Sequence, residues 1–199
     1  MRKLLMILAL TLLVHSLFAQ NTDSLVVDTA STVVVAENQE AELAYNSGIK
    51  MYGAKDFSGA ITHFNEAVKF NPEFLQAFYN RGLAYFELKK YENALSDFKR
   101  TVEIDDKYDR AYYSMGMLFF TQGKYLEALE FFDKALQIGF QAFDMFYASG
   151  QAAFKLEQYA RSVEDFSVAL KLKPDAWEVL NDRASAYRQM NQFDKAIAD

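Results

Sequence analysis

The sequence has 199 residues, enough for one or two domains, and 51% of them are hydrophobic, so the chain can bury a core. It contains no cysteine, which excludes disulfides, thiolate metal sites, cysteine nucleophiles and an anchor attached to an acylated cysteine. The formal net charge of −6 argues against the basic surface that nucleic-acid binding requires.

The first 19 residues have the pattern of a secretory signal peptide. Arg2 and Lys3 provide a positive start, residues 4–14 form an apolar run, and Ala19 is the small residue expected just before a cleavage site. A membrane anchor is the alternative, but a spanning helix needs about 20 apolar residues and this run is shorter. We therefore expect a signal over residues 1–19 and export across the inner membrane to the periplasm or envelope.

Residues 20–37 are predicted to form a flexible linker. The stretch is rich in Thr, Ser, Asp and Val, has no aromatic residue and lacks helical spacing. A short strand added to the sheet of a partner is a second interpretation of the same residues.

From residue 38 to residue 199 the chain repeats itself every 34 residues. Glycine recurs at one register position and phenylalanine at another. These residues are Gly48, Gly82, Gly116 and Gly150, followed by Phe64, Phe98, Phe132 and Phe166. Each unit holds two apolar-periodic segments separated by a short polar break, which predicts antiparallel helix pairs. The predicted repeats are residues 41–74, 75–108, 109–142, 143–176 and a partial fifth, 177–199.

Small residues in register indicate where the helices approach closely. Gly82 and Ala94 are expected to form the contact point between the two helices of the second repeat, and a phenylalanine such as Phe98 is expected to fill the space between stacked repeats. Aromatic residues such as Tyr91, which begin each second helix, are expected to wedge between neighbouring pairs.

The second repeat resembles the tetratricopeptide repeat (TPR) family. It has that family's large residue, Gly, Tyr, Ala and Phe at matching places. They are Phe78, Gly82, Tyr85, Ala94 and Phe98. The first and fourth repeats also carry the family's proline, at Pro72 and Pro174, whereas Asp106 and Phe140 replace it elsewhere. The resemblance implies an all-α, right-handed α-solenoid of antiparallel helix pairs over residues 41–199.

A capping helix is expected at the end of such an array, and the sequence ends at Asp199 without one. Three interpretations follow: a longer protein of which this is a part, a frayed last helix, or self-association through the uncapped end.

The sequence provides little for catalysis. After the signal the chain has a single histidine, His63, no second histidine at metal-binding spacing, and no glycine-rich phosphate loop. We therefore expect neither an enzyme, nor a cofactor, nor a metal site.

The resemblance implies that the first helix of each repeat lines a concave groove that binds protein or peptide segments. The groove residues predicted on this basis are Tyr45, Ile49, Tyr79, Asn80, Leu83, Arg110, Tyr113, Met117 and Tyr147. The competing interpretation is that the aromatic residues only pack neighbouring repeats together. One subclass of the family grips peptide carboxylates with Lys and Asn side chains, and only Asn80 and Arg110 fit that clamp, so a receptor of that kind is not predicted.

These observations predict a non-enzymatic scaffold or adaptor in the bacterial cell envelope. We expect protein or peptide partners, no nucleic acid, and no stable membrane span once the signal is removed. The alternatives are a structural module of a larger envelope protein and the non-catalytic part of an enzyme.

Overall fold

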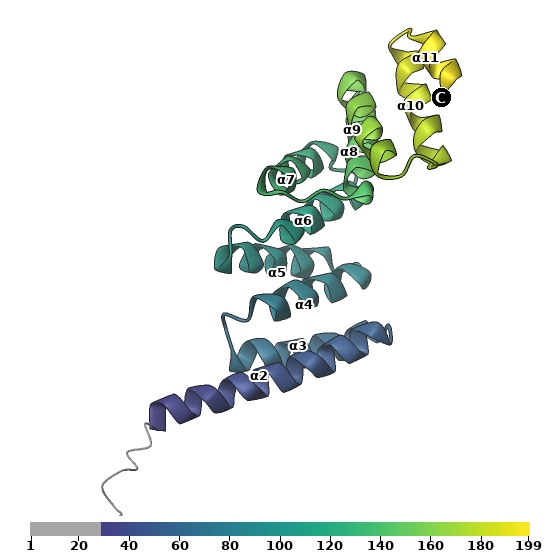
Figure 1. Cartoon of the computed structure of the whole chain (residues 1–199). Coiled ribbons are helices and arrows are strands. Elements are labelled where there is room, and N and C mark those ends of the chain that lie inside the picture. Colours follow the sequence, from purple (N-terminus) through teal and green to yellow (C-terminus); the bar gives the residue numbers. More distant parts are fainter. Residues whose placement is uncertain (1–28) are drawn as a thin grey trace, which may run out of the picture. The chain divides into compact units, whose positions relative to one another are not determined.

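The structure is a computed structural model that describes residues 29–199, with side chains from residue 38 onward. The chain divides after Glu40, and residues 41–199 form a compact unit that carries the repeats. Every regular element among the described residues is an α-helix. In chain order they are α2 (Thr29–Gly53), α3 (Phe57–Phe70), α4 (Leu75–Glu87), α5 (Tyr91–Ile104), α6 (Asp109–Thr121), α7 (Tyr125–Ile138), α8 (Phe143–Lys155), α9 (Tyr159–Leu172), α10 (Trp177–Gln189) and α11 (Phe193–Ala198) (Figure 1).

Helix α2 begins earlier in the chain than the sequence analysis predicted. The expected signal peptide, residues 1–19, and residues 20–28 of the expected linker lie outside the described residues. Residues 29–37, also expected in the linker, are helical. Thr and Val have modest helix propensity, but lengthening an existing helix needs no new nucleation. Here the existing helix is the buried part of α2 that contains Ala41 and Ala44, and residues 29–37 extend it toward the N-terminus.

Helix starts recur at intervals of 34 residues. The second helices all begin with an aromatic residue: Phe57, Tyr91, Tyr125, Tyr159 and Phe193. Four of these rings contact, edge to face, a ring near the end of the first helix of their own repeat, with centroids 5.2, 5.8, 5.8 and 5.4 Å apart. The rings therefore close each helical hairpin, and the expectation that they also wedge between neighbouring repeats stays a prediction.

Each hairpin turn contains one residue in the left-handed region of backbone space. In four of the five turns this residue is not glycine: Lys55, Lys89, Glu157 and Asn191 have φ of 61°, 57°, 60° and 58°. Only Gly123, with φ of 73°, adopts this conformation without a steric penalty. The sequence analysis placed its polar breaks at these same turns.

The glycine of each first helix packs against the phenylalanine of its own second helix. A Cβ atom added to Gly82 would lie 2.7 Å from Cε1 of Phe98, and the next atoms also belong to Phe98 and to Asp97. The nearest neighbour of Gly82 is therefore the ring of Phe98, and the contact expected with Ala94 stays a prediction. Phe98 is completely buried and belongs to the same core cluster as Tyr112 and Met115 of the next repeat, so its ring contributes to the packing between repeats as well as within one helix pair.

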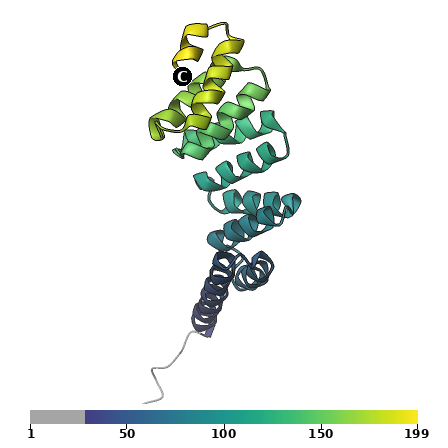
Figure 2. The ribbon, with the colours of Figure 1, turned by 90° about the vertical axis from the view of Figure 1, so that its right-hand side faces the viewer.

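First helices pack on one another as well as on their own second helices. Helix α4 contacts α6, α6 contacts α8, and α8 contacts α10. Within residues 41–199, the second helices α5, α7 and α9 make no comparable backbone contacts with each other. The first helices therefore form the more closely packed inner row, which Figure 2 shows from a second direction. The arrangement confirms the predicted all-α solenoid of helix pairs.

Arginine–aspartate pairs join neighbouring helices on the outer side of this row. Arg81 on α4 donates two hydrogen bonds of 2.8 and 2.7 Å to the carboxylate of Asp97 on α5. Arg183 makes the equivalent pair with Asp199, and Arg161 on α9 bonds Asp133 on α7. Bidentate pairs of this kind fix the relative orientation of two helices and also neutralise the two charges.

None of the helices among residues 29–199 combines the length and the apolar character needed to cross a membrane.

Candidate functional site

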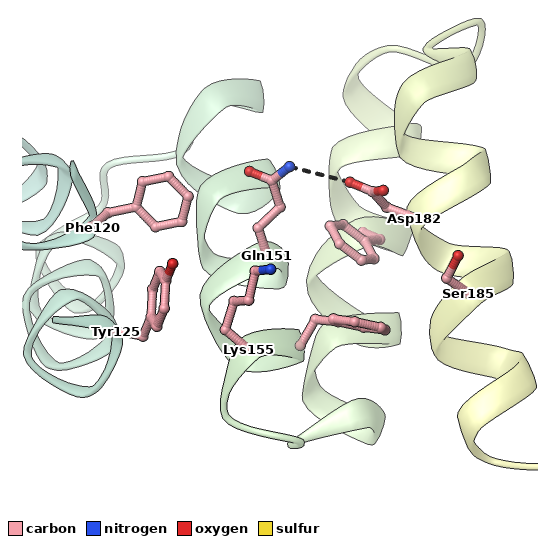
Figure 3. Close-up of a pocket in the computed structure, with 8 residues that line it drawn as sticks. Phe120, Tyr125, Gln151, Lys155, Asp182 and Ser185 are labelled. Carbon is pink, nitrogen blue, oxygen red and sulfur yellow. Dashed lines mark hydrogen bonds between the residues drawn. The ribbon is translucent and has the colours of Figure 1, made fainter. Parts of the chain in front are cut away.

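Two hollows open on the inner row of first helices. The smaller hollow has a volume of about 170 Å³ and lies where α4 and α5 meet α6. Its lining residues are Leu83, Phe86, Glu87, Phe98, Tyr113, Ser114 and Met117. The larger hollow has a volume of about 370 Å³ and lies where α8 and α9 meet α10 (Figure 3). Its lining residues are Phe120, Tyr125, Gln151, Phe154, Lys155, Phe166, Asp182 and Ser185.

The two hollows occupy the same place in the repeat, two repeats apart. Moving 68 residues along the sequence places Phe154 where Phe86 lies and Phe166 where Phe98 lies, so the aromatic wall is retained. The remaining positions change in character. Leu83 becomes Gln151, Glu87 becomes Lys155, Ser114 becomes Asp182 and Met117 becomes Ser185. The smaller hollow therefore has one charged residue, Glu87, in a mostly apolar lining, and the larger hollow is more polar, with Gln151, Lys155, Asp182 and Ser185 beside its aromatic residues.

Asp182 is the best-positioned polar group of the larger hollow. Its Oδ2 atom accepts a hydrogen bond of 3.0 Å from the hydroxyl of Tyr147 and another of 3.2 Å from Nε2 of Gln151. Figure 3 shows the side chains of Gln151 and Asp182 meeting across the gap between α8 and α10, with Lys155 extending from α8 toward Gln151. Burial, reinforced by the bond to Asp182, raises the pKa of Tyr147 to about 12.

Tyrosine side chains connect successive repeats along the inner row. Asn80 donates a hydrogen bond of 3.0 Å to the hydroxyl of Tyr45, and the hydroxyls of Tyr79 and Ser114 lie 3.3 Å apart. The bond from Tyr147 to Asp182 has the same sequence separation of 35 residues. These contacts show that three of the predicted groove tyrosines stabilise the stacking of repeats.

Tyr113 differs from the other tyrosines of the row. The residue at the matching position of the next repeat is Ala148, which has no side-chain acceptor, and the described residues offer the Tyr113 hydroxyl no hydrogen bond. Its ring stacks on Phe140 with centroids 4.7 Å apart and lines the smaller hollow. Burial, with a smaller contribution from Asp144, raises the pKa of Tyr113 to about 12.

The residues predicted from sequence divide into three groups. Leu83, Tyr113 and Met117 line the smaller hollow. Tyr45, Tyr79, Asn80 and Tyr147 form hydrogen bonds between repeats. Ile49 and Arg110 are exposed and line neither hollow.

Three family profiles match the chain. Two of them, both described as tetratricopeptide repeat, match residues 73–139 and residues 147–199, and one described as TPR repeat matches residues 52–89. Together they cover more than half of the chain. The chain belongs to the tetratricopeptide repeat family.

Solved TPR structures share the fold. MamA of Desulfovibrio magneticus RS-1, from residue 41 to its end, is 18% identical with a TM-score of 0.73 over 80% of this chain and 90% of its own. YrrB, described as a TPR protein with an unusual peptide-binding site, is 15% identical with a TM-score of 0.70 over 84% of this chain and 87% of its own. Pseudomonas aeruginosa PilF is 15% identical with a TM-score of 0.69 over 82% of this chain and 74% of its own. A search of curated protein sequences finds no significant match.

TPR repeats generally carry no catalytic centre. Nδ1 of His63 lies 3.3 Å from a carboxylate oxygen of Glu66, one turn along α3. Within residues 29–199 no cluster of three or more His, Asp or Glu side chains is arranged to hold a metal ion. The two hollows on the inner row combine aromatic walls with a few oriented polar groups, the usual make-up of a binding pocket.

Sequence reasoning missed the charged residues of the larger hollow, Lys155 and Asp182. A signal for Asp182 was present, because it occupies in the fifth repeat the position that Asn80 and Ser114 occupy in the second and third. Lys155 lies at the register position of Glu87, and neither residue stands out in a search for aromatic periodicity.

Proposed function

We propose that this TPR protein is a non-enzymatic scaffold that holds an extended segment of a partner protein along its inner row of first helices. The observation that carries the proposal is the pair of hollows at equivalent places two repeats apart. An extended peptide presents side chains at regular intervals, so one segment can place side chains in both hollows. Family membership supports the proposal, because TPR arrays typically mediate protein–protein interaction.

The two hollows offer different chemistry to the same segment. The smaller hollow, with Leu83 and Met117 in its wall, suits an apolar side chain. The larger hollow, with Gln151 and Asp182, suits a polar one. In this proposal Tyr45, Tyr79, Asn80 and Tyr147 maintain the spacing between repeats, and Ile49 and Arg110 contact the segment outside the hollows.

Selection of peptides from a random display library on the purified protein tests this proposal. Met117→Trp and Ser185→Trp each place a bulky ring in one hollow, and Leu136→Trp makes a comparable change on α7, outside the inner row. We expect the affinity of the selected peptides to fall about ten-fold or more in each of the two hollow variants. Leu136→Trp should bind them with the affinity of the parent protein. Equal binding by all three variants, each with the circular dichroism and melting of the parent, would place recognition elsewhere.

We further propose that the protein works in the bacterial cell envelope after export. The pattern of residues 1–19, a positive start followed by an apolar run and Ala19, supports export. N-terminal sequencing of the protein recovered from the periplasmic fraction tests it, and the expected first residue is Gln20. Recovery of a chain that still begins at Met1 from the cytosolic fraction would contradict it.

Self-association is a second candidate function, supported by the apolar face of α11. Ile61, Ala128 and Leu129 are buried by neighbouring helices, whereas Ile197, at the register position of Ile61 and Leu129, is 84% exposed, and Phe193 is 57% exposed. We propose that a second copy covers this face. Sedimentation over a range of concentrations tests it with Ile197→Asp. A concentration-dependent dimer that the substitution abolishes is expected, and a monomer at every concentration would contradict it.

A further inference from the structure

The larger hollow has an unusual carboxylate. Among the described residues, five aspartates accept a hydrogen bond from a side chain of another helix: Asp97, Asp133, Asp165, Asp182 and Asp199. Four of them also form an ion pair with an arginine of this chain, namely Arg81, Arg161 or Arg183. Asp182 receives only the neutral donors Tyr147 and Gln151.

Both neutral donors bind the same oxygen of Asp182. Tyr147 and Gln151 reach Oδ2, so Oδ1 has no hydrogen-bond donor among the described residues. The two bonds fix the orientation of the carboxylate beside the hollow (Figure 3). A fixed carboxylate with a free oxygen is an acceptor that is already oriented for a ligand, which reduces the entropy lost when the ligand binds.

The walls of the hollow suit a long, flat cation. Four aromatic residues line the hollow, namely Phe154, Phe166, Phe120 and Tyr125. A guanidinium group stacks on aromatic rings and binds a carboxylate through two hydrogen bonds, whereas an ammonium group acts as a point charge. Arg81 shows both contacts inside this chain, since it binds Asp97 and lies 5.2 Å from the centre of the Phe78 ring.

Lys155 is the one group that opposes a cation at this place. Its side chain is exposed and lines the hollow, and no ion pair joins it to Asp182 in the structure. Two carboxylates of α10 oppose its charge, because Asp182 and Glu178 both act on the Tyr147 hydroxyl. An exposed lysine can also turn its ammonium toward solvent, so it weakens a bound cation without excluding it.

We propose that the larger hollow is a subsite for an arginine side chain of the bound peptide segment, with Asp182 as its counterion. This inference rests on the proposed groove function and adds the class of side chain that one subsite selects. The guanidinium of the peptide forms with Asp182 the ion pair that no arginine of this chain provides, and the aliphatic part of the arginine side chain lies along Phe154. The apolar counterpart around Leu83 and Met117 has no carboxylate at this register position, because Ser114 replaces it.

The test uses three capped tripeptides, Ala-Arg-Ala, Ala-citrulline-Ala and Ala-Glu-Ala, titrated into the full protein. Citrulline has nearly the shape of arginine but no charge. The readout is the nuclear magnetic resonance signal of the Gln151 side-chain amide, which reports on the hollow itself. We expect saturable shifts with Ala-Arg-Ala and affinities about ten-fold or more weaker for the other two peptides. Equal affinities for arginine and citrulline, or preference for glutamate, would overturn the proposal.

Charge variants separate a specific counterion from the net charge of the protein. Asp182→Asn removes the counterion, and Glu178→Gln removes the same charge from α10 at a residue that does not line the hollow. We expect about a ten-fold loss for Asp182→Asn, little change for Glu178→Gln, and tighter binding for Lys155→Gln. Equal losses of affinity in the first two variants would mean that the peptide responds only to the net charge of the protein, and that Asp182 is not a specific counterion. If Asp182→Asn fails to fold, the proposal is still tested by the tripeptide affinities of the wild-type protein and of Lys155→Gln.

The outcome is separable from that of the groove proposal. Suppose that the displayed peptides bind the two tryptophan variants weakly, while the wild-type protein binds the three tripeptides with equal affinity. The arginine subsite is then wrong and the groove function stands. If no peptide depends on either hollow, the groove function itself is wrong.

Discussion

The backbone of Gly116 lies directly against the ring of Phe132: a Cβ atom at Gly116 would be 2.4 Å from both Cδ1 and Cε1 of that ring. Phe132 is 2% exposed, so its ring has no free space into which it can move. We predict that Gly116→Ala destabilises the protein by about 1–3 kcal/mol through overpacking. This loss outweighs the gain of about 1 kcal/mol that alanine brings to a helix interior. Urea unfolding measures the difference.

Gly53→Ala is the matched control for this substitution. Gly53 is the last residue of the first helix α2, an added Cβ atom there meets nothing within 4 Å, and its backbone is not left-handed. We expect Gly53→Ala to be neutral or slightly stabilising. If the two alanine variants changed the free energy of unfolding equally, close packing would not be the reason for glycine at position 116.

Ser162 gives a prediction of opposite sign. The residue is completely buried, and its hydroxyl is the one buried side-chain polar atom among the described residues without a hydrogen-bond partner. Alanine occupies the equivalent position in the other repeats, for example Ala94 and Ala128. We predict that Ser162→Ala raises the free energy of unfolding by about 1–2 kcal/mol, because an unpaired buried hydroxyl is removed.

Ser149 provides the comparison for Ser162. It is also buried, but its hydroxyl donates a hydrogen bond of 2.6 Å to Asp165. We expect Ser149→Ala to lower stability, so the two serine-to-alanine changes should have opposite signs in the same thermal melt. A loss of stability in both would show that the Ser162 hydroxyl is satisfied in solution.

The periodicity of the sequence was sufficient to predict the helices, because every repeat places the same residue types at the same register positions. The contacts between side chains were harder to predict. A 34-residue period identifies Gly82, Ala94 and Phe98 as equivalent to residues in other repeats, but it does not say which of them touch. The side chain of Phe98 is long enough to cross the helix pair, and its ring supplies the atoms nearest to Gly82.

The hollows show a second limit of repeat-based reasoning. A search for residues that recur emphasises the tyrosines, and three of these connect repeats through hydrogen bonds. In the proposed function, specific recognition depends instead on positions where the repeats differ. Asp182 and Lys155 depart from their counterparts Ser114 and Glu87, and this departure changes the chemistry of an otherwise equivalent hollow. Only the folded arrangement shows that these variable positions share a cavity.

Arg81 and Asp97 allow a double-mutant test of a buried ion pair. Their side chains are 15% and 6% exposed, so removing either one leaves a desolvated charge without its partner. The third repeat has apolar residues at these positions, Met115 and Phe131. We predict that Arg81→Met alone costs about 3 kcal/mol or more, whereas Arg81→Met combined with Asp97→Phe costs clearly less, because buried ion pairs can be replaced by apolar pairs.

The coupling energy from urea unfolding of the two single variants and the double variant measures this effect. Arg100 supplies a control, because its ion pair with Glu73 is largely exposed and should contribute about 1 kcal/mol or less. Additive effects of Arg81→Met and Asp97→Phe would mean that each residue acts alone.

Tyr113 makes stability depend on alkaline pH. Burial raises the pKa of its hydroxyl in the folded protein to about 12, while the unfolded chain has the ordinary value near 10. The contribution of Tyr113 is therefore fully present below pH 10 and is lost as pH rises from 10 toward 12, because the unfolded state releases its proton first. Phenylalanine cannot ionise, so the stability of the wild-type protein relative to Tyr113→Phe should fall above pH 10. Urea unfolding of both proteins on either side of pH 10 measures this difference, and an unchanged difference would show that the hydroxyl is solvated in the folded state.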